Sequence, residues 1–285
     1  MNAPATVATA RPASTLILLR DTPQGPEVLM LKRHGRSDVL GGAFVFPGGK
    51  VDAADAQLSE ADRLDTPAKA LHGRLGEPEI DLTTAVGVYV AALREAFEES
   101  GLLLADGAPA VPAEEIREQH KAGMAFNQLL AHFGLRLGGG GLAPWSRWIT
   151  PSHVPKRFDT RFFVARAPEG VARHDDHETT ESVWRRPRAA LEDYWRGEMP
   201  LAPPQIMTLA ALSPHASVTA ALAAARTRLP ALVQPHMIGE GATRTLCYPG
   251  DEAHPVRMRA MPGPLRLVVR DKRYEPPDGF DAFFA

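Results

Sequence analysis

The chain has 285 residues, a single cysteine and a formal net charge of −2. This length can bury a sizeable core, and the near-neutral charge gives no support for binding to nucleic acid or a membrane surface. Cys247 has no partner for an internal disulfide, which fits a reducing compartment. No apolar run approaches the length of a membrane span, and residues 1–13 lack the apolar stretch of a signal peptide. We therefore expect a cytoplasmic protein that begins with a disordered segment over residues 1–13.

Short apolar runs bounded by turn-forming residues predict strands. In chain order they are residues 15–19, 28–33, 41–49, 146–150, 158–166, 181–185, 237–238, 243–248, 256–261 and 265–270. Helices are predicted from their sequence periodicity and composition. These segments are residues 56–80, polar and with breaks at Pro67 and Pro78, then 84–100, 113–133 with a break near Gly123, 188–196, 205–212 and 216–228. Helices and strands are mixed rather than strictly alternating, so we expect an α+β fold with a mixed sheet.

One long, uninterrupted helix is predicted over residues 84–100. Thr83 or Thr84 would cap its N-terminus, and Gly101 would end it in a left-handed conformation. One side of this helix is apolar, which leaves its glutamates on another side. The glycine run at 138–141, further along, is expected to be a flexible connection because no phosphate-loop lysine follows it.

Three of those glutamates, Glu95, Glu98 and Glu99, stand at i, i+3 and i+4 and so share one face of the helix. Like charges at this spacing repel one another unless something cationic compensates them. A divalent cation such as Mg²⁺, which prefers oxygen ligands, would do so. A solvated helix face that binds no ligand is the alternative.

The glutamates belong to a motif in two halves. Residues 46–55 read Phe-Pro-Gly-Gly-Lys-Val-Asp-Ala-Ala-Asp, and residues 94–102 read Arg-Glu-Ala-Phe-Glu-Glu-Ser-Gly-Leu. Together they resemble the box of the Nudix hydrolases, with Gly49 at its first position and Asp55 where the family has its first glutamate. The two halves are much further apart than in the family pattern, which places an insertion at about 56–86. Such an insertion is a feature of the subgroup similar to peroxisomal coenzyme A diphosphatases.

The resemblance implies an α/β/α sandwich of the Nudix fold over residues 14–229, with a helical insertion in the box. Residues 230–285 would form a β-rich extension packed on or beside this core. It also implies an enzyme that hydrolyses a nucleoside-diphosphate derivative with Mg²⁺ or Mn²⁺. Neither a nucleic acid nor a membrane is an expected partner, and a homodimer is compatible with the sequence.

The same resemblance implies roles for individual residues. The expected metal ligands are Glu95, Glu98, Glu99 and the carbonyl of Gly49. Glu98 and Glu99 are the expected catalytic residues, with Glu98 either a ligand or the acceptor of the water proton. In several Nudix enzymes a loop outside the box supplies the base, which leaves Glu178 and Glu181 as alternatives. The residues expected to hold the box together are Arg94, Asp55 and Gly101, and those expected to contact substrate are Arg33 and Gly48.

Upstream of the box, Arg33, Gly42 and residues 46–49 match the spacing of a pattern found in coenzyme A-cleaving Nudix enzymes. Asp38 stands where that pattern has a second arginine, and a carboxylate cannot grip a phosphate. Coenzyme A or an acyl-coenzyme A, cut to phosphopantetheine and adenosine 3′,5′-bisphosphate, is the leading substrate. ADP-ribose, NADH, dinucleoside polyphosphates and a module that binds a nucleotide without catalysis stay open.

Three other clusters carry chemically useful side chains. Residues 157–159 and 184–186 combine arginine with an aromatic ring and could stack on adenine or meet phosphates, or be ordinary strand residues. Residues 174–178 are of metal-ligand types, but adjacent positions cannot all converge on one ion. A solvated loop is therefore expected there.

Overall fold

The computed structural model describes residues 8–37, 40–58, 63–106, 113–175 and 178–285. Its largest sheet has eight strands: β1 (Arg11–Thr22), β2 (Gly25–Arg33), β3 (Phe44–Val45), β4 (Gly48–Lys50), β7 (Ala143–Ile149), β8 (Phe158–Arg166), β9 (Thr179–Arg185) and β10 (Ala231–Val233). Their order is β10-β7-β8-β1-β2-β3, with β4 also paired to β1 and β9 to β2. Strand β1 runs parallel to β8 and antiparallel to β2, so the predicted mixed sheet is confirmed.

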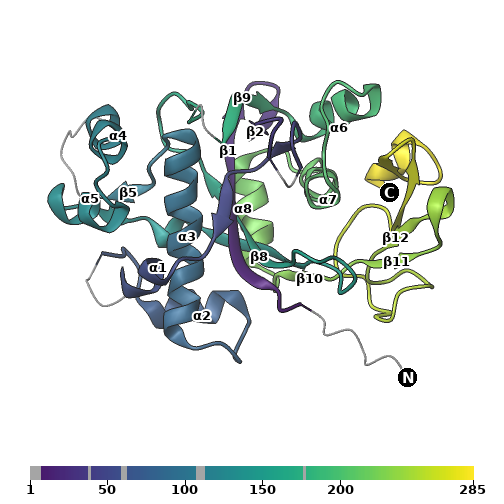
Figure 1. Cartoon of the computed structure of the whole chain (residues 1–285), viewed down its shortest axis with the longest axis horizontal. Coiled ribbons are helices and arrows are strands. Elements are labelled where there is room, and N and C mark those ends of the chain that lie inside the picture. The colour runs from purple at the N-terminus through teal and green to yellow at the C-terminus, as the bar shows by residue number, and fades with distance from the viewer. Residues whose placement is uncertain (1–7, 38–39, 59–62, 107–112, 176–177) are drawn as a thin grey trace.

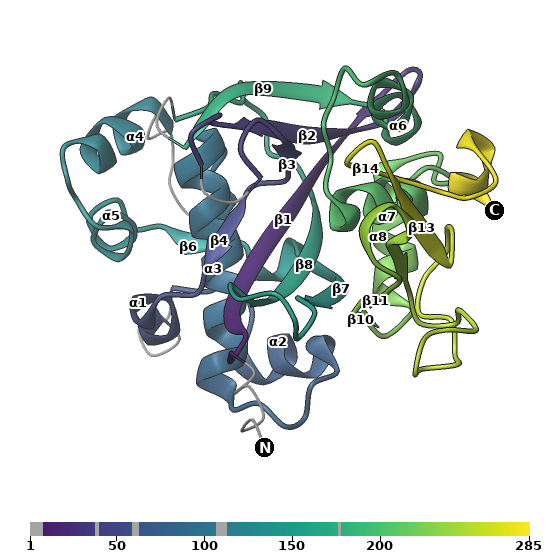
Figure 2. The same ribbon diagram turned by 45° about the vertical axis from the view of Figure 1, so that its right-hand side comes forward.

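Helices cover both faces of this sheet (Figure 1). In chain order they are α1 (Ala53–Gln57), α2 (Ala68–Leu75), α3 (Leu82–Ser100), α4 (Ala113–Lys121), α5 (Phe126–His132), α6 (Pro187–Arg196), α7 (Pro203–Leu212) and α8 (Val218–Arg226). Helix α3 packs on one face, and α7 and α8 pack on the other. A two-stranded ribbon, β5 (Ala105–Asp106) with β6 (Arg136–Leu137), lies beside α4 and α5 (Figure 2). The predicted α/β/α sandwich is therefore confirmed.

The middle of β1, Leu16–Leu19, is an unbroken apolar run because both faces of the sheet are covered there. Successive side chains of a strand point to opposite faces of the sheet. Leu16 and Leu18 pack in the core beneath α3, whereas Ile17 and Leu19 pack in the core beneath α7 and α8. Because both faces are covered, no position along this stretch has to be polar.

The segment that interrupts the box is bonded to the sheet through buried charges. Glu77, between α2 and α3, places its Oε2 2.6 Å from Nη2 of Arg161 and 2.8 Å from Nη1 of Arg147. Asp159 forms ion pairs with both arginines at 2.9 Å. Glu77 and Arg161 are 7% and 5% exposed. The insertion is thus an integral part of the packed structure rather than a loop on its surface.

Helix α3 starts earlier than expected. The backbone N–H of Thr84 donates to Oδ1 of Asp81 at 2.6 Å, which makes Asp81 the N-cap and Leu82 the first helical residue. The prediction of Thr83 or Thr84 was wrong because the Asp81 carboxylate caps the helix further upstream, which places both threonines inside its first turn. Gly101, with φ +70°, ends the helix.

Other differences also have local causes. The strand expected over 41–49 is split into β3 and β4, because Pro47 between them lacks an N–H group. The glycines at 139–141 form a turn of 3₁₀ helix rather than a flexible connection, and Gly140 N–H donates to Oδ1 of Asp65 at 2.8 Å. No strand forms over 256–261.

Beyond α8, the chain adds a strand to the main sheet and then builds a second sheet (Figure 2). Strand β10 pairs parallel with β7. The second sheet follows the order β11 (His236–Ile238), β12 (Thr245–Cys247), β13 (Arg266–Arg270) and β14 (Arg273–Glu275). The predicted β-rich extension is therefore confirmed as β structure. Among the helices described, none combines the length and the apolar composition needed to cross a membrane.

Candidate active site

The two halves of the box meet in space. Strand β4, which carries Gly48 and Gly49, pairs with β1 and lies against the C-terminal half of α3. The backbone N–H of Gly48 donates to Oε2 of Glu99 at 3.0 Å, across 51 positions of sequence. Glu99 is only 4% exposed. Glu95 and Glu99 on this side of α3 therefore lie against the glycine loop.

Arg94 joins the elements of the box. Its Nε and Nη2 donate to the two carboxylate oxygens of Asp55 at 2.8 and 3.0 Å, and Nη2 also donates to the carbonyl of Lys50 at 3.0 Å. Its Nη1 lies 2.9 Å from a carboxylate oxygen of Glu95 and of Glu98. Asp55, although shorter than the family's glutamate, is 2% exposed and makes the full bidentate pair.

Gly49 lies directly against the carboxylate of Glu95. A methyl group built at Gly49 would stand 2.5 Å from the carboxylate carbon and from Oε1 of Glu95. This distance is well inside van der Waals contact. Only a residue without a side chain lets the backbone and this carboxylate approach so closely.

Gly49→Ala is therefore expected to push the Glu95 carboxylate out of position and to lower turnover by at least tenfold, since small misplacements of reacting groups are costly. Gly73→Ala is the matched control, because Gly73 lies in α2 with nothing near its added methyl group. That control should keep full turnover. Steady-state rates of the two purified variants test this, and equal rates would contradict it.

Burial shifts the acidity of two of the three glutamates. Burial raises the pKa of Glu95 to about 7, with Arg94 opposing the shift and Glu98 adding to it. Burial also raises the pKa of Glu99 well above its ordinary value, although the N–H of Gly48 opposes this. Of these two desolvated carboxylates on adjacent turns, Glu95 has Arg94 as its nearby cation and Glu99 has Arg33. Additional positive charge would stabilise both.

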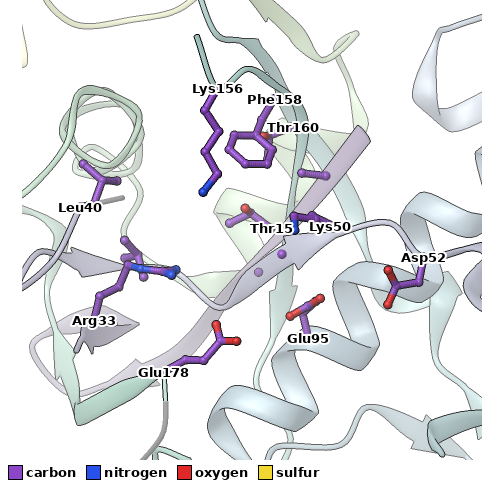
Figure 3. A pocket seen from close by; sticks show the side chains of 14 residues that line it. Thr15, Arg33, Leu40, Lys50, Asp52, Glu95, Lys156, Phe158, Thr160 and Glu178 are labelled. Atoms are coloured by element: carbon purple, nitrogen blue, oxygen red, sulfur yellow. The ribbon is translucent and has the colours of Figure 1, made fainter. Parts of the chain in front are cut away.

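A cavity of about 490 Å³ opens beside these carboxylates (Figure 3). Its walls come from the box, from the end of β2, and from the starts of β8 and β9 with the residues just before them. The side chains that matter below are Glu95 and Lys50, Arg33 and Glu178, and Lys156 and Phe158. Carboxylates and cations therefore face one another across a space large enough for part of a nucleotide.

Arg33 reaches this cavity from the end of β2. Its Nε is buried and has no hydrogen-bond partner among the described residues. Its charge is close enough to Glu99 to oppose the rise in the pKa of that carboxyl. A guanidinium held in this way can accept an anionic ligand without first breaking an ion pair. Asp38, at the matching position upstream of the box, lies outside the described residues.

Glu178 lies on the same side of the cavity, and its loop is well anchored. Its backbone N–H donates to the carboxylate of Asp175, and its carbonyl accepts the N–H of His34 at 2.8 Å. The carboxylate also acts on Glu95 and Glu99, raising the pKa of both. Glu181, the other alternative, is instead 3.6 Å from Lys32. Asp176 and His177 of the same run lie outside the described residues.

Glu98 faces a different hollow, of about 590 Å³, which it shares with Glu95, Glu99, Glu178 and α4. Its Oε2 is held by Arg94, and its Oε1 lies 3.6 Å from Nε2 of His120. His120 was not singled out in the sequence, where nothing marks a helix 20 residues beyond the box as its neighbour. Arg94 thus holds one oxygen of Glu98, as it holds one oxygen of Glu95.

The donor set suits a hard divalent cation. All the candidate ligands offer oxygen, and Mg²⁺ typically takes one or two carboxylates with the remaining positions filled by water and substrate phosphates. Glu95 and Glu99, both desolvated, could supply those carboxylates beside the backbone of Gly49. In the described part of the chain, no three acidic or histidine side chains already converge on one point. A full protein cage is therefore absent there, and substrate oxygens would have to complete the shell.

Comparisons with known proteins agree with this geometry. The family model described as the NUDT19 Nudix domain matches residues 3–212. The chain belongs to this family of Nudix hydrolases. It is therefore a hydrolase that cleaves diphosphates, and both the family and the subgroup predicted from the interrupted box are confirmed.

Individual relatives are similar over most of the chain. Putative nudix hydrolase 7 of Caenorhabditis elegans is 27% identical over 274 residues, which span 92% of this chain and 80% of that protein. Acyl-coenzyme A diphosphatase NUDT19 of Gallus gallus is 30% identical over 245 residues, spanning 69% of this chain and 64% of that protein. This chain thus matches less than two thirds of the chicken protein.

A solved structure supports the fold independently. The crystal structure of a NUDIX hydrolase from Alicyclobacillus acidocaldarius superposes with a TM-score of 0.63 at 29% sequence identity. The match covers 79% of this chain and 99% of that one. The Nudix fold is therefore shared beyond the box itself.

Proposed function

We propose that this Nudix hydrolase cleaves the diphosphate of coenzyme A or an acyl-coenzyme A with the help of Mg²⁺ or Mn²⁺. The products would be the phosphopantetheine or its acyl derivative and adenosine 3′,5′-bisphosphate. The observation that carries the proposal is the cavity in which Glu95 and Glu178 face Arg33 and Lys156. The NUDT19 relatives, which are named acyl-coenzyme A diphosphatases, point the same way.

The chemistry of the cavity suits a diphosphate. A bound divalent cation would neutralise the diphosphate and lower the pKa of an attacking water. Arg33 would hold non-bridging phosphate oxygens with its unpaired N–H groups. The N–H of Gly48 keeps Glu99 in one orientation, and Arg94 with Asp55 keeps the glycine loop against α3. These contacts position the reacting groups before substrate arrives.

The proton of the attacking water needs an acceptor, for which Glu98 and Glu178 are the candidates. Glu178 lines the cavity with Glu95, whereas Glu98 is held by Arg94 on the other side. We therefore assign the base to Glu178. Glu178→Gln should lower kcat by roughly 10²–10⁴-fold, the range of a positioned base. A loss of this size in Glu98→Gln, with near wild-type kcat in Glu178→Gln, would reverse the assignment.

Metal binding should depend on pH in a defined direction. Because the pKa of Glu95 is raised to about 7, a cation that binds below that pH must first displace a proton. Mg²⁺ should therefore raise Tm more at pH 8 than at pH 6. At pH 8, a hundredfold excess of Mg²⁺ over Kd should add about 2.7 kcal/mol to the free energy of unfolding. Thermal melts with Mg²⁺ or with EDTA measure this. Equal gains at both pH values would contradict it, and Glu95→Gln should make the difference smaller.

A substrate panel tests the proposal itself. Purified protein with Mg²⁺ is incubated with coenzyme A, an acyl-coenzyme A, ADP-ribose, NADH and diadenosine polyphosphates, and the products are identified by mass. We expect adenosine 3′,5′-bisphosphate from the coenzyme A substrates at the highest kcat/KM. Cleavage of ADP-ribose with coenzyme A untouched would overturn the proposal.

A further inference from the structure

We propose that Lys156 and Phe158 form a subsite for an adenosine 3′-phosphate and so decide which nucleoside diphosphates the enzyme accepts. The inference rests on the proposed function, because the subsite belongs to the cavity in which the diphosphate would bind. It concerns the wall opposite Glu95 and Glu178. Figure 3 shows Lys156 and Phe158 on one wall, with Glu95 and Glu178 on the wall opposite. A substrate whose diphosphate lies at the carboxylate wall would extend its nucleoside toward this pair.

Phe158 offers a rigid aromatic surface. It is the first residue of β8, and its N–H and carbonyl bond to Oγ1 and N–H of Thr150 at 3.0 and 2.9 Å. On its other side, Arg11 of β1 is its partner in the parallel pairing. Its half-buried ring thus cannot swing away with a loop. A ring fixed in this way can stack on a base, since every base has a π face.

Lys156 supplies a positive charge to the cavity. No described carboxylate forms an ion pair with it. The neighbouring Arg157 is engaged instead, with Nε donating to the carbonyl of Thr150 and Nη1 to the carbonyl of Ala8. Of the two adjacent cations, only Lys156 therefore extends into the cavity, as Figure 3 shows.

A cation beside a stacking surface suits a nucleoside that carries an additional phosphate on its ribose. The 5′-diphosphate already has Arg33 as a partner, so Lys156 is available for a second, separate phosphate. Coenzyme A carries such a group at the 3′ position, whereas ADP-ribose, NADH and diadenosine polyphosphates do not. The pair would therefore select coenzyme A from among the substrates that the box alone could cleave.

The test compares coenzyme A with dephospho-coenzyme A, which differ only by the 3′-phosphate. Wild type should prefer coenzyme A in kcat/KM by about tenfold or more, the value of a charge-assisted contact. Lys156→Ala should bring this ratio close to one. Phe158→Leu, which keeps an apolar side chain but removes the stacking ring, should lower kcat/KM for both substrates by about tenfold while Tm stays near that of wild type.

Lys50→Ala is the matched control, because Lys50 places a cation on the box wall of the same cavity. It should leave the ratio at the wild-type value. Cleavage of coenzyme A with a ratio that Lys156→Ala does not change would overturn the subsite alone. No cleavage of coenzyme A by wild type would overturn the proposed function, and the subsite with it.

Discussion

Glu99→Gln is expected to lower kcat by roughly 10²–10⁴-fold and, at the same time, to make the metal-free protein more stable. Activity falls because the variant loses a carboxylate that could neutralise a cation at the diphosphate. Stability rises because burial holds the pKa of Glu99 above its unfolded value, so ionising it at pH 8 costs folding free energy that a neutral amide does not. Steady-state rates with Mg²⁺ and thermal melts with EDTA measure the two effects.

Glu115→Gln is the control for that substitution, since Glu115 is an exposed glutamate on α4. It should match wild type in both measurements. Near wild-type turnover of Glu99→Gln would contradict the assignment of the box as the active site. Loss of turnover together with a lower Tm in EDTA would instead mean that the buried carboxylate is structural.

Glu77→Ala should cost about 3–5 kcal/mol of unfolding free energy, and lower Tm by roughly 6–12 °C or more. The substitution leaves Arg161, which is 5% exposed, with Asp159 as its remaining partner in the network. The penalty comes from a buried guanidinium that has lost its bidentate carboxylate. Urea unfolding followed by circular dichroism gives the free energy directly.

Glu79→Ala is the control that distinguishes the effect of losing a buried ion pair from the effect of losing one negative charge. Glu79 also pairs with Arg147, at 3.2 Å, but its side chain is 60% exposed. Water replaces such a contact readily, so stability should stay close to wild type. Similar losses from the two substitutions would show that net charge, rather than the buried network, accounts for the effect.

The sequence predicted the chemistry of the box better than its surroundings. Glutamates at i, i+3 and i+4 indicated a shared helix face, and the resemblance of both halves of the motif to the Nudix box linked that face to the glycines. Gly48 and Glu99 could therefore be assigned to one site although 51 positions separate them. The burial of Glu99 could not be read in the same way, because it depends on how β4 packs against α3.

Residues outside the box were harder to place for a related reason. Phe158 and Trp184 belong to two clusters that the sequence ranked equally as places where an adenine could stack. The structure distinguishes them: Trp184 lies under the guanidinium of Arg20, while Phe158 lines the cavity. Lys156 carried no pattern at all, since its position is set by the connection between β7 and β8. Glu77 and Arg161 are 84 positions apart, and nothing local relates them.

Strand β10 changes what the C-terminal extension means for the molecule in solution. Its pairing with β7 satisfies backbone N–H and carbonyl groups that would otherwise form an open edge of the main sheet. Open edges recruit strands from other molecules, and short covering strands are one way in which proteins prevent this. The segment after α8 thus covers an edge of the main sheet at which strands of other molecules could pair.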